Sequence, residues 1–446
     1  MRKHFANAGY GVLDYVSYPA GMLLVAPIVL GRLGSAEYGL WMIATAVISA
    51  GGIVASGFCD ACIQRLAHLR GAGQSDRMPQ TIRSIMGINV VLGSTLAVGS
   101  WIAAPFAARH IGVARLLPAQ ECLTALRIAS ASILVRAIES VGVGVHRAFE
   151  HYRGTVRIST ANRVLTLATA ALLAWLGCGI VSILLATVVF LVFGTAMQFV
   201  GLRKFLGSAW FSPRFSRGET RILFGQGVFA WLQALGGLVF AQFDRILLGI
   251  WLGALAVTPY SLCVQFAHPI SGLAASGLNF LFPYLSGRAS NLSRDGLKKT
   301  VLKAMLCNLL IVMCGAGILL LAGDRLIQIW AGPAVARSAA HILPPIVLGS
   351  AMTGLSVTGT YALQALGEFR TVAILSFAAR AAMLLMMIDL LRHRGLEGLA
   401  LSRLFYGSVS LLVYPALFQL LKSGSKERKR DSAMVIAREV REGSKP

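Results

Sequence analysis

Ionisable side chains inside long apolar stretches are the residues of this sequence best suited to chemistry. Asp14 lies within "YGVLDYVSYPAG", and Tyr10 and Tyr18 lie four residues away on either side. A charge at membrane depth costs about 2.5–3.5 kcal/mol on insertion scales, so it needs a cavity, a partner or a route to the surface. A desolvated carboxylate can bind a proton or a sodium ion, whereas one near the end of a span needs only a tyrosine hydrogen bond. Asp14 is therefore the candidate for ion coupling, with a structural role as the alternative.

The stretch "LRIASASILVRAIESVGVGVHRAFEHYR" (126–153) carries a second set of embedded charges. Arg136 and Glu139 have the i,i+3 spacing of a helical ion pair, so we expect them to neutralise each other within a bundle. Arg127 precedes Arg136 by nine residues, which is half a turn out of phase at about 3.6 residues per turn. Only Glu121 and Thr124 could serve as its partners on the same helix. Arg127 is therefore a candidate for meeting a bound ligand.

Two further arginines occupy matched positions in the sequence. Arg163 ends the pattern "SxAxR" at 159–163, and Arg380 ends the same pattern at 376–380. Each lies ten residues after another arginine, Arg153 or Arg370, which is a rise of about 15 Å in a continuous helix. Snorkelling to the inner surface is difficult from that depth. We expect both to face polar surroundings and to help hold an anionic group, which the planar guanidinium fork suits. Capping by carbonyl groups inside each bundle is the alternative.

Four more ionisable residues complete the set of candidates. Arg403 and His268 lie at membrane depth and are candidates for ligand binding, although His268 fits a satisfied core histidine equally well. Asp244 and Arg245 are expected near the outer interface, as a structural ion pair that anchors and orients its helix.

Patterns typical of catalysis are lacking in the loops. The sequence holds no HExxH motif, no Ser/His/Asp arrangement and no glycine-rich loop of the phosphate-cradling kind. Cys59 and Cys62 form one close pair, "CDAC", but a zinc site would need further ligands nearby, and free cysteines are usually buried as small apolar residues. We therefore predict neither an enzyme nor a metal centre, and no cofactor apart from a coupled H+ or Na+ ion.

The elements that must position these residues are membrane helices. Of the 446 residues, 56% are hydrophobic and only 13% are charged, against about 25% charged residues in a soluble domain. A spanning helix needs about 20 mostly apolar residues, and long apolar runs favour helices over a barrel. We predict an all-α integral membrane protein with twelve transmembrane helices: 9–30, 38–62, 82–106, 118–143, 157–177, 179–201, 222–248, 256–281, 300–322, 339–365, 370–391 and 396–420.

The distribution of positive charge predicts the orientation. The net charge is +23, and most of the 41 Lys and Arg fall on one side once the spans alternate across the membrane. Cytoplasmic loops carry such an excess, so both termini are predicted to be cytoplasmic. Basic residues do not interleave with aromatic ones in a single stripe, which argues against nucleic-acid binding. The basic tail, 422–446, could lie on anionic headgroups, although orientation and solubility explain it equally well.

The sequence also repeats itself. "LG" at 33–34 followed by Tyr38 recurs as "LG" at 252–253 followed by Tyr260. "EHYRGTVRIS" (150–159) likewise corresponds to "GEFRTVAILS" (367–376). We predict two pseudo-symmetric six-helix bundles, 1–205 and 206–421, around a central cleft. An even number of spans inserts both bundles the same way up, as in the parallel repeats of transporters.

An ordered series of motifs carries a family resemblance. The series runs "GRLGSAEYGLW" (31–41), "FDRILLGIWLGALAVTPYSL" (243–262), "FLFPYLSGRAS" (280–290), "IQIWAG" (327–332), "ALQALGEFRTVAIL" (362–375) and "GLEGLAL" (395–401). It resembles the bacterial polysaccharide flippases of the multidrug/oligosaccharidyl-lipid/polysaccharide exporter superfamily, over nearly the whole chain up to about residue 420.

The resemblance implies a MATE-like fold and a function. An alternating-access flippase of the bacterial inner membrane would move a lipid-linked oligosaccharide of the polyprenyl diphosphate type, such as an O-antigen, capsule or exopolysaccharide repeat unit. The anionic group met by the arginines would then be a diphosphate or an acidic sugar. We also expect contacts with membrane lipids and with polymerase or export partners. A cation-coupled multidrug exporter is the main alternative, because it shares the architecture. A membrane-embedded polymerase or ligase would need a large external loop, which the sequence lacks.

Overall fold

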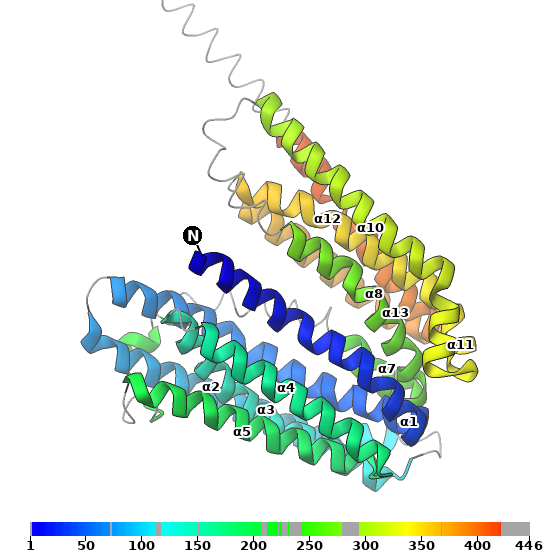
Figure 1. Ribbon diagram of the computed structural model, residues 1–446, viewed down its shortest axis with the longest axis horizontal. Coiled ribbons are helices and arrows are strands. Elements are labelled where there is room, and N and C mark those ends of the chain that lie inside the picture. Colours follow the sequence, from blue (N-terminus) through cyan, green and yellow to red (C-terminus); the bar gives the residue numbers. More distant parts are fainter. Residues whose placement is uncertain are drawn as a thin grey trace, which may run out of the picture. The chain divides into compact units, whose positions relative to one another are not determined.

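The computed structural model describes residues 2–71, 74–111, 117–149, 152–206, 212–221, 223–224, 231, 242–278, 294–366 and 368–420. Every regular element within these ranges is a helix, which confirms the all-α prediction (Figure 1). Packing divides the chain into two compact units. Unit 1 comprises Met1–Gln265 and Arg325–Ala339, and unit 2 comprises Phe266–Asp324 and Ala340–Pro446.

Unit 1 is built on five long helices. These are α1 (Arg2–Gly71), α2 (Met78–Ile111), α3 (Ala119–Ala148), α4 (Tyr152–Trp175) and α5 (Ile180–Leu206), with a short 3-10 turn, η1 (Ser75–Arg77), before α2. Helix α3 packs against α1, α2 and α5, so it is central to the bundle (Figure 1). The unit is completed by α7 (Asp244–Leu252), the first part of α8 (Ala254–Gly277), the end of α10 (Arg294–Ala331) and most of α11 (Pro333–Ala340).

Unit 2 contains the rest of α8 and α10 together with α12 (Leu343–Ala365) and α13 (Phe369–Ser410). Helices α12 and α13 pack along each other. A core of small and branched apolar side chains, with Leu363 and Leu417 fully buried, holds this unit together. Because lipid tails are as apolar as these side chains, close packing and polar contacts between helices have to supply much of the stability.

Glycines in the left-handed region mark the sharp bends of the chain. Gly34 (φ 85°) bends α1, and Gly253 (φ 80°) separates α7 from α8. Gly177 (φ 76°) separates α4 from α5, and Gly395 (φ 56°) bends α13. A positive φ is costly for residues with a Cβ, so glycine is required at these turns. Gly34 and Gly253 lie 219 residues apart and Gly177 and Gly395 lie 218 apart, which is the period of the sequence repeat.

Seven stretches of the described chain are long and apolar enough to cross a membrane. They are Gly21–Val54, Met78–Ile111, Ala119–Ala148, Ile180–Arg203, Lys298–Ala331, Leu343–Ala365 and Arg370–Leu420. The protein is therefore a multi-pass membrane protein. The helices α1 and α13 each continue through a glycine bend and cover two predicted spans, so the total of twelve spans stays a prediction. The division into units follows packing, and the two predicted halves, 1–205 and 206–421, stay a prediction as well.

Candidate functional site

The stretch "GRLGSAEYGLW" contains the bend in α1 and contacts α8. After the bend at Gly34 the chain re-enters the bundle, where Tyr38 is fully buried. The Tyr38 hydroxyl accepts a hydrogen bond from Gln265 Nε2 at 3.1 Å. Two turns earlier on α8, Thr258 Oγ1 donates to the Ser35 carbonyl at 2.6 Å. The motif therefore fixes the bend in α1 to the first turns of α8.

The residue types at two positions of the same stretch, Gly39 and Glu37, follow from the contacts that they make with other helices. A Cβ on Gly39 would overlap the Ala254 carbonyl oxygen of α8, so a larger residue could not keep this contact. Glu37 Oε2 accepts a hydrogen bond from the Ile180 N–H at 3.0 Å and so caps the first turn of α5. A carboxylate is favourable there because the first amides of a helix lack partners and the macrodipole is positive at that end.

Asp244, which is predicted to lie near the outer interface, is completely buried within unit 1. The helix α7 continues to Leu252, four residues beyond the predicted end of this span, so Asp244 lies more than two turns from the bend at Gly253. The hydroxyl of Tyr260, itself fully buried, donates to Asp244 Oδ2. The expected partner, Arg245, has a side-chain Nε that is buried without a hydrogen-bond acceptor among the described residues. Tyr260 therefore takes the place of the expected arginine partner.

The motif "IQIWAG" makes a further contact within unit 1. Trp330 Nε1 donates to the Leu23 carbonyl of α1 at 3.0 Å, and the chain then turns at Gly332 with φ 87°. Three of the motifs that carry the resemblance are thus sites where helices are joined, and their partners could not be identified from the sequence alone.

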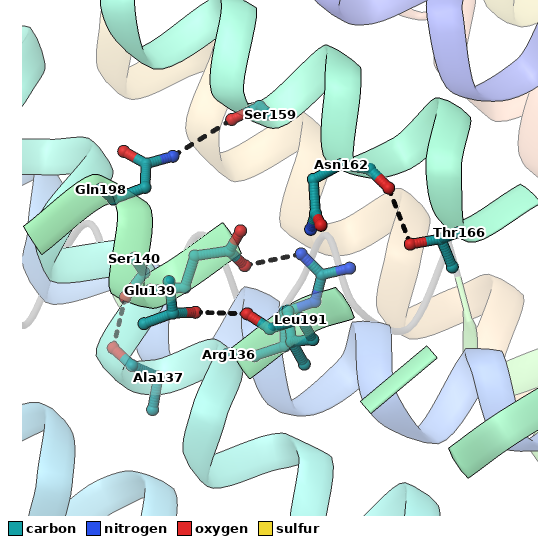
Figure 2. A network of polar contacts seen from close by, with 10 residues as sticks. Arg136, Ala137, Glu139, Ser140, Ser159, Asn162, Thr166, Leu191 and Gln198 are labelled. Atoms are coloured by element: carbon teal, nitrogen blue, oxygen red, sulfur yellow. Dashed lines mark hydrogen bonds and ion pairs between the residues drawn. The ribbon is translucent and has the colours of Figure 1, made fainter. Parts of the chain in front are cut away.

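A network of polar contacts lies between α3, α4 and α5 (Figure 2). Arg136 donates to Glu139 Oε2 at 2.7 Å, with side chains 40% and 12% exposed (Figure 2). The methylene stem of Arg136 lies beside Gly52 of α1. The i,i+3 pair expected from the sequence is therefore present, with the Arg136 side chain partly exposed and the Glu139 side chain nearly covered.

Amide and hydroxyl groups from α4 and α5 surround this ion pair. Gln198 Nε2 donates to Ser159 Oγ at 3.3 Å, and Asn162 points toward Arg136 (Figure 2). Asn162 fits because Gly194 has no side chain: a Cβ there would lie 2.6 Å from Asn162 Nδ2. The side-chain carbonyl oxygens of Asn162 and Gln198 are both buried and lack partners among the described residues. Buried acceptors without donors are costly, so this region favours a bound water, cation or proton donor.

The ion pair and the amide groups around it together suit the exchange of the Glu139 carboxylate for an anionic ligand. An accessible guanidinium can exchange its carboxylate partner for an anionic ligand group, because both accept the same fork of hydrogen bonds. The carboxylate left behind would then need a proton or a cation. Groups of three or more His, Cys, Asp or Glu that could hold a metal ion do not occur among the described residues.

The remaining predicted site residues lie on several helices of the two units. The guanidinium of Arg127 lies 5.1 Å from the centre of the Trp101 ring, a cation–π contact on α2 and α3. Arg163 on α4 and Arg380 on α13 are partly buried, and Arg380 Nε lacks a hydrogen-bond partner among the described residues. Arg403 is buried at 7% exposure, whereas His268 is exposed.

Three predictions fall outside the described part. The side chain of Asp14 is not described, although its backbone belongs to α1. The tail, 422–446, and the motif at 280–290 also lie outside the described residues.

Two buried asparagines were missed from the sequence. Asn89 of α2 and Asn308 of α10 each donate from the side-chain amide to a backbone carbonyl and to a hydroxyl on a neighbouring helix. Both stand in apolar runs, "GINVVLGS" and "LCNLLIVM". Their spacing of 219 residues, equal to the repeat, is the signal that could have singled them out.

Comparison with known proteins agrees with this architecture. The family model described as "Polysaccharide biosynthesis protein" matches residues 29–340. The "Uncharacterized membrane protein EpsK" of Bacillus subtilis (strain 168) is 22% identical over 400 residues, covering 88% of this chain and 78% of that protein.

Two solved structures share the fold. A multidrug resistance MATE family transporter of the MOP superfamily, in its inward-facing conformation, has a TM-score of 0.73 at 16% identity and covers 93% of this chain and 99% of its own. The lipid II flippase MurJ, in an inward closed conformation, has a TM-score of 0.72 at 13% identity and covers 93% and 87%. These proteins are described as transporters and flippases, not enzymes, as predicted here. The chain belongs to the polysaccharide biosynthesis protein family and has the fold of the MOP-superfamily transporters.

Proposed function

We propose that this protein is an alternating-access flippase that moves a lipid-linked oligosaccharide of the polyprenyl diphosphate type across the bacterial inner membrane. In this proposal twelve spans form two six-helix halves, both termini are cytoplasmic, and polymerase or export partners receive the product. The observation that carries it is an arginine, Arg136, held accessible inside a helix bundle by Glu139 in a chain of the polysaccharide biosynthesis family. An embedded arginine is costly, so in membrane proteins such residues pair with another charge or face a cavity, and they mark substrate pathways.

Coupling of transport to an ion follows from the same ion pair, Arg136 and Glu139. The diphosphate of the substrate competes with Glu139 for the guanidinium of Arg136, and the released carboxylate takes up a proton or Na+ near the oxygens of Asn162 and Gln198. Asp14 is the second candidate for this ion, as expected from the sequence. Arg127, Arg163, Arg380, Arg403 and His268 remain the candidates for binding the rest of the headgroup.

The test is flipping of a fluorescent polyprenyl diphosphate oligosaccharide by purified protein in proteoliposomes, with and without a pH or Na+ gradient. A charge-assisted hydrogen bond contributes about 1.5–3 kcal/mol, so Arg136→Ala should slow flipping by about tenfold or more. Arg136→Lys should retain part of the rate, because lysine keeps the charge without the fork. Glu139→Gln should flip without responding to the gradient.

Two results would count against the proposal. Gradient-dependent flipping at the wild-type rate by Arg136→Ala would remove the exchange step. Gradient-driven transport of small organic cations, with no movement of the lipid-linked sugar, would instead assign the protein to the multidrug exporters that share its fold.

A further inference from the structure

The segment that follows α5 is docked on the end of unit 1 formed by the α1–α2 connection. We call residues 212–221 and 223–224 the strap. The Arg214 N–H donates to the Arg83 carbonyl at 3.3 Å, and the Ser216 N–H donates to Ser84 Oγ at 3.3 Å. Leu223 is fully buried in a cluster of apolar residues from α1, α2 and α3. The strap is therefore a fixed part of unit 1 and not a free tether.

One acidic residue, Glu219, anchors the strap to α1 and α2. Glu219 is 6% exposed and receives two hydrogen bonds from Arg65 of α1, from Nε at 3.1 Å and from Nη2 at 2.9 Å. Thr81 Oγ1 of α2 donates to the same carboxylate at 3.0 Å. This bidentate pairing leaves little freedom to rotate, so it also determines which side of the strap faces outward.

The exposed side of the strap is basic. Arg214, Arg217 and Arg221 are all exposed; Arg217 and Arg221 lie one turn apart in the short helix 217–221 and so share a face, and Arg214 precedes that helix. None of the three guanidinium groups has a hydrogen-bond or ion-pair partner among the described residues. Phe215 is 60% exposed and Phe224 is 42% exposed. The rings of both phenylalanines also contact unit 1, Phe215 at Gly87 and Phe224 at Phe58. The single acid of the strap is thus buried while its three arginines are exposed.

We propose that the strap is a binding surface for anionic phospholipid headgroups on the cytoplasmic leaflet. This end of unit 1 carries the α1–α2 connection, which the distribution of Lys and Arg predicts to be cytoplasmic. A negatively charged leaflet attracts basic segments within about a Debye length of its surface. Guanidinium forks bind phosphate through two parallel hydrogen bonds. Orientation by positive charge would not require the segment that carries the arginines to be docked on unit 1 with its single acid buried.

The experiment compares amide hydrogen exchange of the full chain in nanodiscs of phosphatidylcholine alone and of phosphatidylcholine mixed with phosphatidylglycerol. Phosphatidylglycerol should slow exchange across 212–224 by about fivefold, and about 0.5 M salt should remove the effect because it screens exposed charges. The triple variant Arg214→Gln/Arg217→Gln/Arg221→Gln should lose the response, and the corresponding triple lysine variant should keep part of it.

Controls separate binding from folding and from net charge. The variant Arg109→Gln/Arg325→Gln/Arg337→Gln removes three exposed positive charges from other helix ends and should respond as the wild type does. If the triple glutamine variant also changes exchange in 78–90, the single variant Arg217→Glu provides the readout with the strap still docked.

Three results would overturn the proposal. They are equal exchange of the wild-type strap in both lipids, a full response of the glutamine variant, and protection of the strap by trace polyprenyl diphosphate that excess phosphatidylglycerol cannot match. The last result would assign the surface to the diphosphate lipid. None of these outcomes depends on whether the protein flips an oligosaccharide.

Discussion

Asn89 and Asn308 make the same interhelical contact in two different units, 219 residues apart. Asn89 Nδ2 donates to the Ala137 carbonyl at 3.0 Å and to Ser140 Oγ at 2.9 Å. Asn308 Nδ2 donates to the Gly354 carbonyl at 2.9 Å and to Thr358 Oγ1 at 3.0 Å. In both cases the acceptor hydroxyl lies one turn after the acceptor carbonyl. A repeat first seen in turns and arginines is therefore also present in the polar contacts that join the helices.

Replacing these asparagines should destabilise each unit separately. Hydrogen bonds between membrane helices contribute about 0.6–2 kcal/mol, so Asn89→Ala and Asn308→Ala should each lower the free energy of unfolding by that amount. Because the two sites share no partner, the double variant should show the sum. Steric trapping or denaturant titration in mixed micelles measures this. The control is Thr95→Ala, which removes only an exposed hydroxyl bonded within its own helix. Strong coupling between the two asparagines would contradict their independence.

Removing the cap of α5 should loosen the start of that helix. Glu37→Ala leaves the Ile180 N–H without its acceptor, and loss of a cap costs about 1 kcal/mol. Amide exchange at 180–184 should accelerate by about fivefold, whereas Glu37→Gln, which keeps a carbonyl acceptor, should have a smaller effect. Unchanged exchange in Glu37→Ala would show that water replaces the cap.

The stabilisation of the fold by the ion pair of Glu219 with Arg65 should depend on pH. Hydrogen bonds from Arg65, and secondarily from Thr81, hold the pKa of Glu219 below its ordinary value, although burial opposes this. A carboxyl whose folded pKa is lowered stabilises the fold above its unfolded pKa of about 4.3, and this contribution is lost as the pH falls through the folded pKa. Thermal unfolding in detergent from pH 7 down to pH 3 should follow this loss.

The matched variants make the pH effect specific. Glu219→Gln leaves Arg65 partly buried without its anion, so it should cost about 3 kcal/mol at neutral pH and flatten the acid limb of the curve. Arg65→Lys should keep a weaker pH dependence. An identical acid limb in Glu219→Gln would mean that another carboxyl is responsible.

The topology can be tested with reporter fusions at the predicted external turns. Fusions after Gly34, Gly112, Cys178, Ala256, Gly332 and His393 should all report the outside, and fusions at either terminus should report the cytoplasm. Inside signals at two or more of the six positions would rule out the arrangement of twelve spans in two halves.

The paired arginines Arg163 and Arg380 give a test of substrate binding. If both help to hold an anionic headgroup, Arg163→Ala and Arg380→Ala should each reduce polymer export by about tenfold at normal protein levels, the equivalent of about 1.4 kcal/mol. Asp14→Asn should abolish ion-driven flipping while expression stays normal. Full export by both arginine variants would assign these guanidinium groups to carbonyl capping within their bundles.

Local features of this protein could be read from its sequence, and distant contacts could not. The i,i+3 spacing of Arg136 and Glu139 was informative because a helix fixes the distance between such residues. By contrast, Glu37 caps a helix that begins 143 residues later, and Glu219 meets an arginine 154 residues away. The periodicity of apolar residues shows which face of a helix is buried, but it does not show which helix packs against that face.

The packing of unit 1 has a consequence for biosynthesis. Tyr38 bonds to Gln265, and the Leu23 carbonyl bonds to Trp330, so the first helix needs residues that leave the ribosome 227 and 307 positions later. The first helices must therefore wait in the membrane, incompletely packed, until the chain has been made as far as Ala339. A gene split after α5 would deliver an N-terminal fragment without these partners, and the two fragments would have to meet in the membrane before either could finish folding.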